Sequence, residues 1–107
     1  MFARVVECHS KVGRSGQVGN KLSNSVLPIL QQQVAFADFL MLADKTDPER
    51  LLCISLWISQ ENADEYDSQH YYAITRILKP LLESPPTLET FEVNASIGHR
   101  IAVGRAA

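Results

Sequence analysis

The stretch "LLCISLWISQENADEY", Leu51 to Tyr66, contains the transition that decides the fold. Its first half is almost continuously apolar, which predicts a buried strand, and its second half becomes charged and helix-like. Ser59 lies at the junction as a helix cap, and the acidic residues after it complement the positive end of the helix dipole. The sequence therefore predicts a strand followed directly by a helix, with Trp57, the only tryptophan of the chain, where they meet.

The flanking sequence predicts the remaining elements by the same periodicities. Pro28 interrupts an otherwise helical pattern, so we expect a kink at residues 24–27. The sequence SPP, residues 84–86, ends the second helix. The order strand, helix, strand, strand, helix, strand is that of a ferredoxin-like α+β domain, βαββαβ, with an antiparallel four-stranded sheet and two helices on one face. The predicted elements are strand 2–10, helix 15–33, strand 34–44, strand 51–59, the helix that follows Ser59, and strand 87–96.

Size and charge exclude several classes of protein. At 107 residues and 11.9 kDa the chain forms a single domain, predicted over residues 1–98 with a C-terminal tail at residues 99–107. The net charge is −2 and no run of Lys or Arg is present, which excludes nucleic acid and anionic membranes as partners. The N-terminus lacks the apolar core of a signal peptide, and no apolar stretch approaches the roughly 20 residues of a membrane span, so a cytoplasmic location is expected.

The two cysteines do not indicate a metal site. Cys8 and Cys53 are single residues in separate strands, without a second Cys or His at a metal-ligand spacing. His9 follows Cys8, but neighbouring residues of a strand point to opposite faces. The sequence therefore predicts reduced thiols and no metal.

Two of the predicted strands indicate a homodimer. A sheet with helices on one face only should alternate apolar with polar residues, yet both faces of "FLMLA" and "LLCISLWIS" are apolar. We expect the aliphatic series in the third strand to face the helices, and the series that contains Ser55 and Trp57 to face a second copy of the chain. Two such sheets would bury roughly 800 Å² per partner, enough for an obligate dimer. A monomer is the alternative.

The chain resembles the antibiotic biosynthesis monooxygenase (ABM) family of dimeric α+β barrel proteins. The likeness covers residues 1 to about 98 and rests on four segments and on the order of the elements. These segments are "MFARVVE", "VLPIL", "DPERLLCISLWISQENADEY" and "LKPLLESPPTLETFEV". The resemblance implies a homodimer whose two sheets form a barrel, with a pocket in each subunit between its sheet and its helices.

The resemblance also implies a reaction class. Similar proteins include oxygenases that oxidise phenols or quinols without flavin or metal. A deprotonated phenol is electron-rich enough to reduce O₂ directly, so such a protein supplies a base, an oxyanion donor and an apolar cavity. The expected function is a cofactor-independent monooxygenase acting on a small phenolic, quinol or polycyclic aromatic substrate. The alternative is a non-catalytic dimer that binds a small apolar molecule or serves as an assembly module.

The candidate site residues lie on the third strand and the second helix. His70 is the most plausible proton acceptor, because histidine exchanges protons near neutral pH. Tyr66 lies four residues before His70, so both rings share one helix face. Trp57 could lie over the substrate and donate its indole N–H, or simply be a core residue. The candidate catalytic residues are therefore His70, Trp57 and Tyr66, and the candidate substrate-binding residues are Tyr71, Arg76, Asn94 and Ser55.

Two further hypotheses concern the outer polar residues and haem. Glu92 and Asn94 on the last strand, with Arg4 and Glu7 on the first, could complete a polar rim. Haem-degrading relatives use a helix histidine, an Asn on the first strand and a second Trp at the start of the second helix. In this chain Arg76 and Tyr66 lie near the expected places of the histidine and that Trp, and the first strand has no Asn, so haem turnover is not expected.

Overall fold

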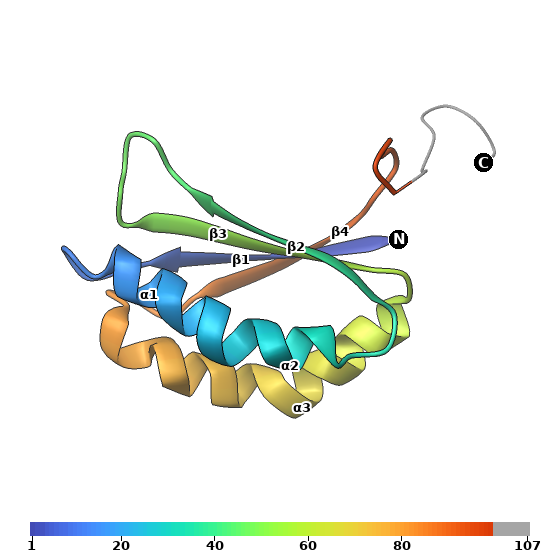
Figure 1. Cartoon of the computed structure of the whole chain (residues 1–107), viewed down its shortest axis with the longest axis horizontal. Coiled ribbons are helices and arrows are strands. Elements are labelled where there is room, and N and C mark those ends of the chain that lie inside the picture. The colour runs from blue at the N-terminus through green and yellow to red at the C-terminus, as the bar shows by residue number, and fades with distance from the viewer. Residues whose placement is uncertain (100–107) are drawn as a thin grey trace.

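A computed structural model describes residues 1–99 of the chain. Its four strands form one antiparallel sheet in the order β2-β3-β1-β4, and the helices lie on a single face of that sheet (Figure 1). The predicted ferredoxin-like α+β fold is therefore confirmed. The strands are β1 (Phe2–His9), β2 (Phe36–Ala43), β3 (Arg50–Trp57) and β4 (Thr87–Glu92).

The first helical region is divided where the proline predicts a kink. It begins with α1 (Ser15–Lys21), passes through a π-helical segment, η1 (Leu22–Val26), and continues as α2 (Leu27–Gln31). Pro28 lies in the first turn of α2, where its missing N–H costs little. The π-helical segment displaces the hydrogen-bonding pattern just before that proline, which is a known cause of helix distortion.

The second helix, α3 (Gln60–Leu78), begins as the sequence predicts. Ser59 is its N-cap, and the Ser59 hydroxyl accepts a hydrogen bond from the backbone N–H of Asn62. A short 3₁₀ turn, η2 (Lys79–Leu81), follows α3. The helical spacing predicts Ala73 and Ile77 on the same inward face as Tyr66 and Ile74, but in the structure both are exposed. Ala63, Tyr66, Ile74 and Leu78 are the buried residues of this helix.

The structure reverses the predicted orientation of β3. Leu51, Cys53, Ser55 and Trp57 are buried against the helices, whereas the aliphatic residues between them are only partly buried and point to the opposite face. Both series of this strand are apolar, so the alternation alone did not distinguish the two faces. Trp57 has the largest side chain of this strand, and the helices together with Phe36 bury it completely.

The opposite face of the sheet, here called the open face, has no helix over it in the described part of the chain (Figure 1). The register aligns Leu40 with Ile54 and Leu42 with Leu52 on this face, and Val5 lies next to Ile54 on the other side. Leu40 and Leu42 are 43% and 42% exposed. The structure thus presents a continuous aliphatic surface, made from the series that the sequence was expected to direct toward the helices.

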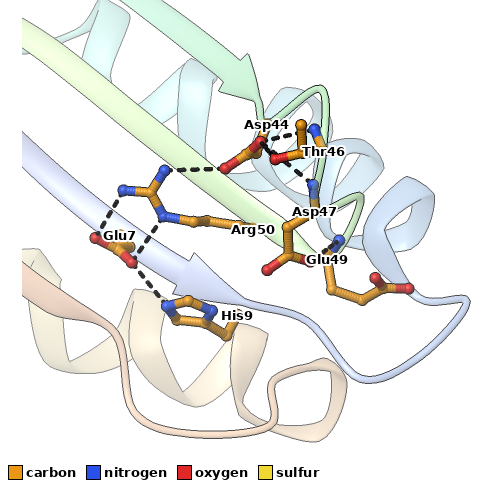
Figure 2. A network of polar contacts seen from close by, with 7 residues as sticks. All are labelled: Glu7, His9, Asp44, Thr46, Asp47, Glu49 and Arg50. Atoms are coloured by element: carbon orange, nitrogen blue, oxygen red, sulfur yellow. Dashed lines mark hydrogen bonds and ion pairs between the residues drawn. The ribbon is translucent and has the colours of Figure 1, made fainter.

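A network of polar contacts occupies one end of the open face, where β2 and β3 meet their connecting loop (Figure 2). Arg50 lies between two carboxylates and donates from Nε to Glu7, at 3.0 Å, and from Nη1 to Asp44, at 3.2 Å. His9 Nε2 is 2.7 Å from Glu7 Oε2. Asp44 also accepts hydrogen bonds from the backbone N–H and hydroxyl of Thr46. These contacts tie the β2–β3 hairpin to β1.

The predicted tail, residues 99–107, lies outside the described residues except for His99. His99 Nε2 is 3.2 Å from Oδ2 of Asp38 on β2. None of the helices in residues 1–99 combines the length and the apolar character that a membrane crossing needs.

Candidate active site

Aromatic side chains from two strands and one helix meet between the sheet and the helices. Trp57 is completely buried at the end of β3, and its ring packs edge-on against Phe36, with centroids 5.7 Å apart. The Tyr66 ring of α3 lies 5.2 Å from Trp57 on one side and 5.5 Å from His70 on the other. The contact expected between residues four apart on α3 is therefore present, and it extends inward to Trp57.

Ser55 holds the indole of Trp57. The two residues are adjacent on the buried face of β3, and Trp57 Nε1 donates to the Ser55 hydroxyl oxygen at 2.9 Å. This hydrogen bond satisfies two polar groups that would otherwise be buried without a partner. The indole N–H is thus used within the protein, and the ring of Trp57 is covered by its neighbours.

Arg4 brings a positive charge into this aromatic cluster. It is only 4% exposed and pairs with Asp67 of α3. Its guanidinium lies 5.3 Å from the ring centroid of Tyr66 and 5.8 Å from that of Tyr71, within the range of cation–π attraction. The sequence placed Arg4 only at a polar rim. Arg4 pairs with Ser55 in the sheet, so both side chains lie on the same face. Once Ser55 is known to face the helices, this pairing identifies Arg4 as a residue of the inner site.

A small cavity adjoins these groups. Its volume is about 40 Å³, and its polar lining includes Arg4, Ser55, Tyr66 and Tyr71. A water molecule occupies about 30 Å³ in the liquid, so the cavity in this conformation has room for about one water. An aromatic ligand would therefore have to displace side chains, or separate α3 from the sheet, in order to enter.

The two tyrosines of the cavity remain hydrogen-bond donors at neutral pH. Burial raises the pKa of Tyr66 to about 12, because the charged phenolate would lose its hydration. Burial also raises the pKa of Tyr71. Both phenols therefore keep their protons and can donate to an oxyanion, while the guanidinium of Arg4 supplies a fixed positive charge.

Two thiols line the same cavity. Cys8 and Cys53 are buried on neighbouring strands, and the register places them diagonally across the β1–β3 pair. A hydrogen bond with Cys8, together with burial, raises the pKa of the Cys53 thiol. His9 points to the open face toward Glu7, as the alternation predicts. Within residues 1–99 no group of three or more His, Cys, Asp or Glu side chains is placed to hold a metal ion.

The structure brings some of the predicted site residues together and separates others. Ser55, Trp57, Tyr66 and Tyr71 converge at the cavity or contact a residue that lines it. His70 is partly buried and reaches the group through its contact with Tyr66.

Arg76 and Asn94 lie apart from this group. Arg76 is on the exposed side of α3, with its guanidinium 5.9 Å from the ring centroid of Tyr72. Asn94 is exposed beyond the end of β4.

The fold closely matches several solved structures. A protein from Deinococcus radiodurans, provisionally assigned as an antibiotic biosynthesis monooxygenase, superposes with a TM-score of 0.77 at 13% identity, over 91% of this chain and 96% of that protein. A similarly assigned protein from Bordetella bronchiseptica gives 0.73 at 12% identity, over 86% and 95% of the two chains. A protein of unknown function from Nitrosomonas europaea gives 0.75 at 21% identity, over 89% and 90%.

No protein-family model and no curated protein sequence matches the chain. The structural matches therefore confirm the expected resemblance to ABM proteins at the level of the fold, which covers nearly the whole of each chain.

Proposed function

We propose that the chain is an ABM-type monooxygenase that oxidises a small phenolic or quinol-like aromatic compound with O₂ and without a cofactor. The observation that carries this proposal is the placement of Arg4 over the rings of Tyr66 and Tyr71, beside a cavity between the sheet and the helices. A buried cation and two protonated phenols are suited to bind a phenolate oxygen, and the surrounding rings are suited to an aromatic body.

The proposed reaction converts a phenol to a quinone. Loss of the phenolic proton gives a phenolate, which transfers one electron to O₂. The resulting radical and superoxide combine at a ring carbon that bears hydrogen, and the peroxide then loses water. One oxygen atom of O₂ enters the ring as the new carbonyl. The other leaves as water with the two hydrogens from the phenolic O–H and the C–H.

Each residue has a distinct role in this proposal. His70, at the outer end of the aromatic stack, accepts the phenolic proton. Tyr66 forms part of the wall against which the substrate ring packs. Trp57 supports the Tyr66 ring from within the core, and Ser55 fixes the orientation of Trp57. Arg4 and Tyr71 stabilise the phenolate oxygen. We assign no role in the reaction to Asn94.

We also propose that the active form is a homodimer joined through the open faces. The aliphatic surface around Ile54 leaves Leu40 and Leu42 more than 40% exposed to water, and a second copy offers the same surface in return. The Arg50 network at one end of this surface gives it a polar boundary.

Oxygen consumption tests the proposed reaction. Flavin-free, metal-stripped protein is mixed with a panel of naphthols, hydroquinones and anthrones, and uptake is compared with the uncatalysed rate. We expect His70→Ala to lower the catalysed rate about 100-fold, the usual contribution of a general base. His99→Ala is the matched control, because His99 lies away from the cavity and contacts Asp38.

Two results of the oxygen-uptake experiment would contradict the proposal. Uptake that persists undiminished in His70→Ala would remove His70 from the mechanism. No uptake above background across the whole panel would overturn the oxygenase proposal and leave a dimeric binding or assembly module.

A further inference from the structure

A second and larger cavity lies on the outer side of α3. Its volume is about 570 Å³, within the range of small-molecule sites, and it is bounded by α3, the β1–α1 loop and the segment that leads into β4. Tyr72, Thr75 and Arg76 enter it from one face of α3, since they follow the spacing of three and four residues. Lys79, the first residue of η2, continues that spacing. Here this cavity is called the outer groove.

The outer groove is positively charged although the chain is not. Lys11, Arg76 and Lys79 line it together with a single carboxylate, that of Glu83, whereas the net charge of the whole chain is −2. None of these three cations forms an ion pair within residues 1–99. The groove therefore offers a local excess of unneutralised positive charge.

The lining also suits a flat apolar body. Tyr72 is 75% exposed, and the guanidinium of Arg76 lies 5.9 Å from its ring centroid. Leu82, Pro85 and Pro86 add apolar atoms to the lining of the groove. A planar guanidinium beside an aromatic ring favours a carboxylate attached to an aromatic ring, because both parts of such a ligand find a partner.

The outer groove adjoins the inner cavity. Thr75 of α3 and Pro86, just before β4, line both spaces, and they are the only two residues of the described chain that do. The Thr75 hydroxyl donates to the backbone carbonyl of Tyr72, so this side chain is held in place at the boundary. The narrow inner cavity and the wide charged groove are thus neighbouring compartments with one shared wall.

We infer that the outer groove is the entrance to the active site and that it selects aromatic substrates carrying a carboxylate. Arg76, with Lys79 and Lys11, binds the carboxylate, and the ring passes between Thr75 and Pro86 toward Tyr71 and Arg4. The inference rests on the proposed function for the reaction that follows entry, but not for binding. Arg76 does not line the inner cavity, so in this inference it binds the substrate during entry and takes no part in the reaction itself.

A matched pair of ligands tests the selection. Binding of 1-hydroxy-2-naphthoate and of 1-naphthol, which differ only in the carboxylate, is measured by titration calorimetry. We expect the naphthoate to bind at least about 10-fold more tightly, and Arg76→Gln to remove most of that advantage while leaving naphthol affinity unchanged. Lys45→Gln, an exposed lysine of the β2–β3 loop, should alter neither affinity.

Binding and turnover separate the two proposals. Equal affinities for the two ligands, or an equal loss of both in Arg76→Gln, would overturn the entrance inference even if oxygen is consumed. A carboxylate preference that depends on Arg76, in protein that consumes no oxygen, would support the inference and contradict the oxygenase proposal.

The boundary between the compartments is tested by the rate of entry. Trp57 is the only tryptophan, so its fluorescence change in a stopped-flow experiment reports arrival of 1-naphthol in the inner cavity. We expect Thr75→Phe to slow association at least about 10-fold by filling the opening, and Thr75→Ser to leave it unchanged. An undiminished association rate in Thr75→Phe would show that ligands enter elsewhere. Were Thr75→Phe to misfold, the ligand pair with Arg76→Gln would still decide the inference.

Discussion

Ser55 fixes the orientation of the Trp57 ring. It sits two positions before Trp57 on the buried face of β3 and accepts the only hydrogen bond found for the indole N–H in the described chain. At 5% exposure it has little access to water that could replace that bond. The orientation of the largest side chain in the site therefore depends on one hydroxyl.

Removal of that hydroxyl should destabilise the protein measurably. Ser55→Ala leaves a buried N–H without an acceptor, and we expect the free energy of unfolding to fall by about 1–3 kcal/mol. Urea unfolding followed by circular dichroism measures the change. Ser68→Ala is the control: it removes an exposed helix hydroxyl, and we expect a change within about 0.5 kcal/mol. Equal effects of the two substitutions would contradict the importance of the Trp57 contact.

The sequence predicted some members of the site and not others, for a physical reason. Helical spacing was sufficient to place Tyr66 beside His70, because both lie on one element. Arg4 could not be placed centrally, since its position depends on which face of β3 carries Trp57 and on a pairing between strands distant in sequence. Arg76 was predicted to bind substrate from the second helix, but nothing in the sequence separates its groove from the inner cavity.

At the scale of elements, the hairpin of β2 and β3 depends on charge. The hydrogen bonds that Asp44 accepts from the backbone N–H and hydroxyl of Thr46, together with one from Arg50, lower its pKa from the ordinary 3.8 to about 2. Glu7, bound by Arg50 and His9, also has a lowered pKa. Both carboxylates are therefore more acidic in the folded protein than in the unfolded chain.

The lowered pKa of Asp44 makes the stability of the folded protein depend on pH. Between about pH 4 and pH 2 the unfolded chain binds a proton at Asp44 that the folded protein does not, so stability is complete above this window and falls within it as the pH decreases. We expect Asp44→Asn to reduce the slope of unfolding free energy against pH in that range. Glu65→Gln, on the exposed side of α3, serves as the control. An unchanged slope in Asp44→Asn would contradict this role of the hairpin network.

The periodicity of the sequence predicts the local features of the helices but not the orientation of β3. The helix cap at Ser59 and the distortion before Pro28 are local signals, and the structure contains both. The predicted end of the second helix at the SPP sequence is wrong, because α3 ends at Leu78, just before the 3₁₀ turn that contains Pro80. The orientation of β3 is not local, because both of its faces are apolar and only the packing of distant helices chooses between them. The same holds for the inner cavity, whose size depends on side chains from both layers.

For the whole molecule, the open face is the feature that a solitary domain leaves unexplained. Its aliphatic centre includes Ile54, flanked by Leu40 and Val5 on the neighbouring strands. The reversal of β3 strengthens the dimer proposal, since the surface available to a partner is purely aliphatic at this point. The prediction of a dimer thus stands on a different set of residues from the set that first suggested it.

Light scattering during gel filtration tests this assembly. We expect the wild-type chain to elute at twice the 11.9 kDa of one copy, and Ile54→Glu to elute as a folded monomer, because a buried unpaired carboxylate opposes association. Val12→Glu, at a residue 88% exposed in the loop after β1, should remain dimeric. A wild-type mass of 11.9 kDa would exclude the homodimer.

The proposed monooxygenase reaction is tested by following the oxygen atoms of O₂ into the product. The wild-type protein is supplied with ¹⁸O₂ and the phenol that gives the fastest oxygen uptake, and the product is analysed by mass spectrometry at short reaction times. We expect one ¹⁸O atom in each quinone formed. A quinone that carries no ¹⁸O, or a substrate recovered unchanged, would contradict the assignment of this fold and aromatic site to a monooxygenase.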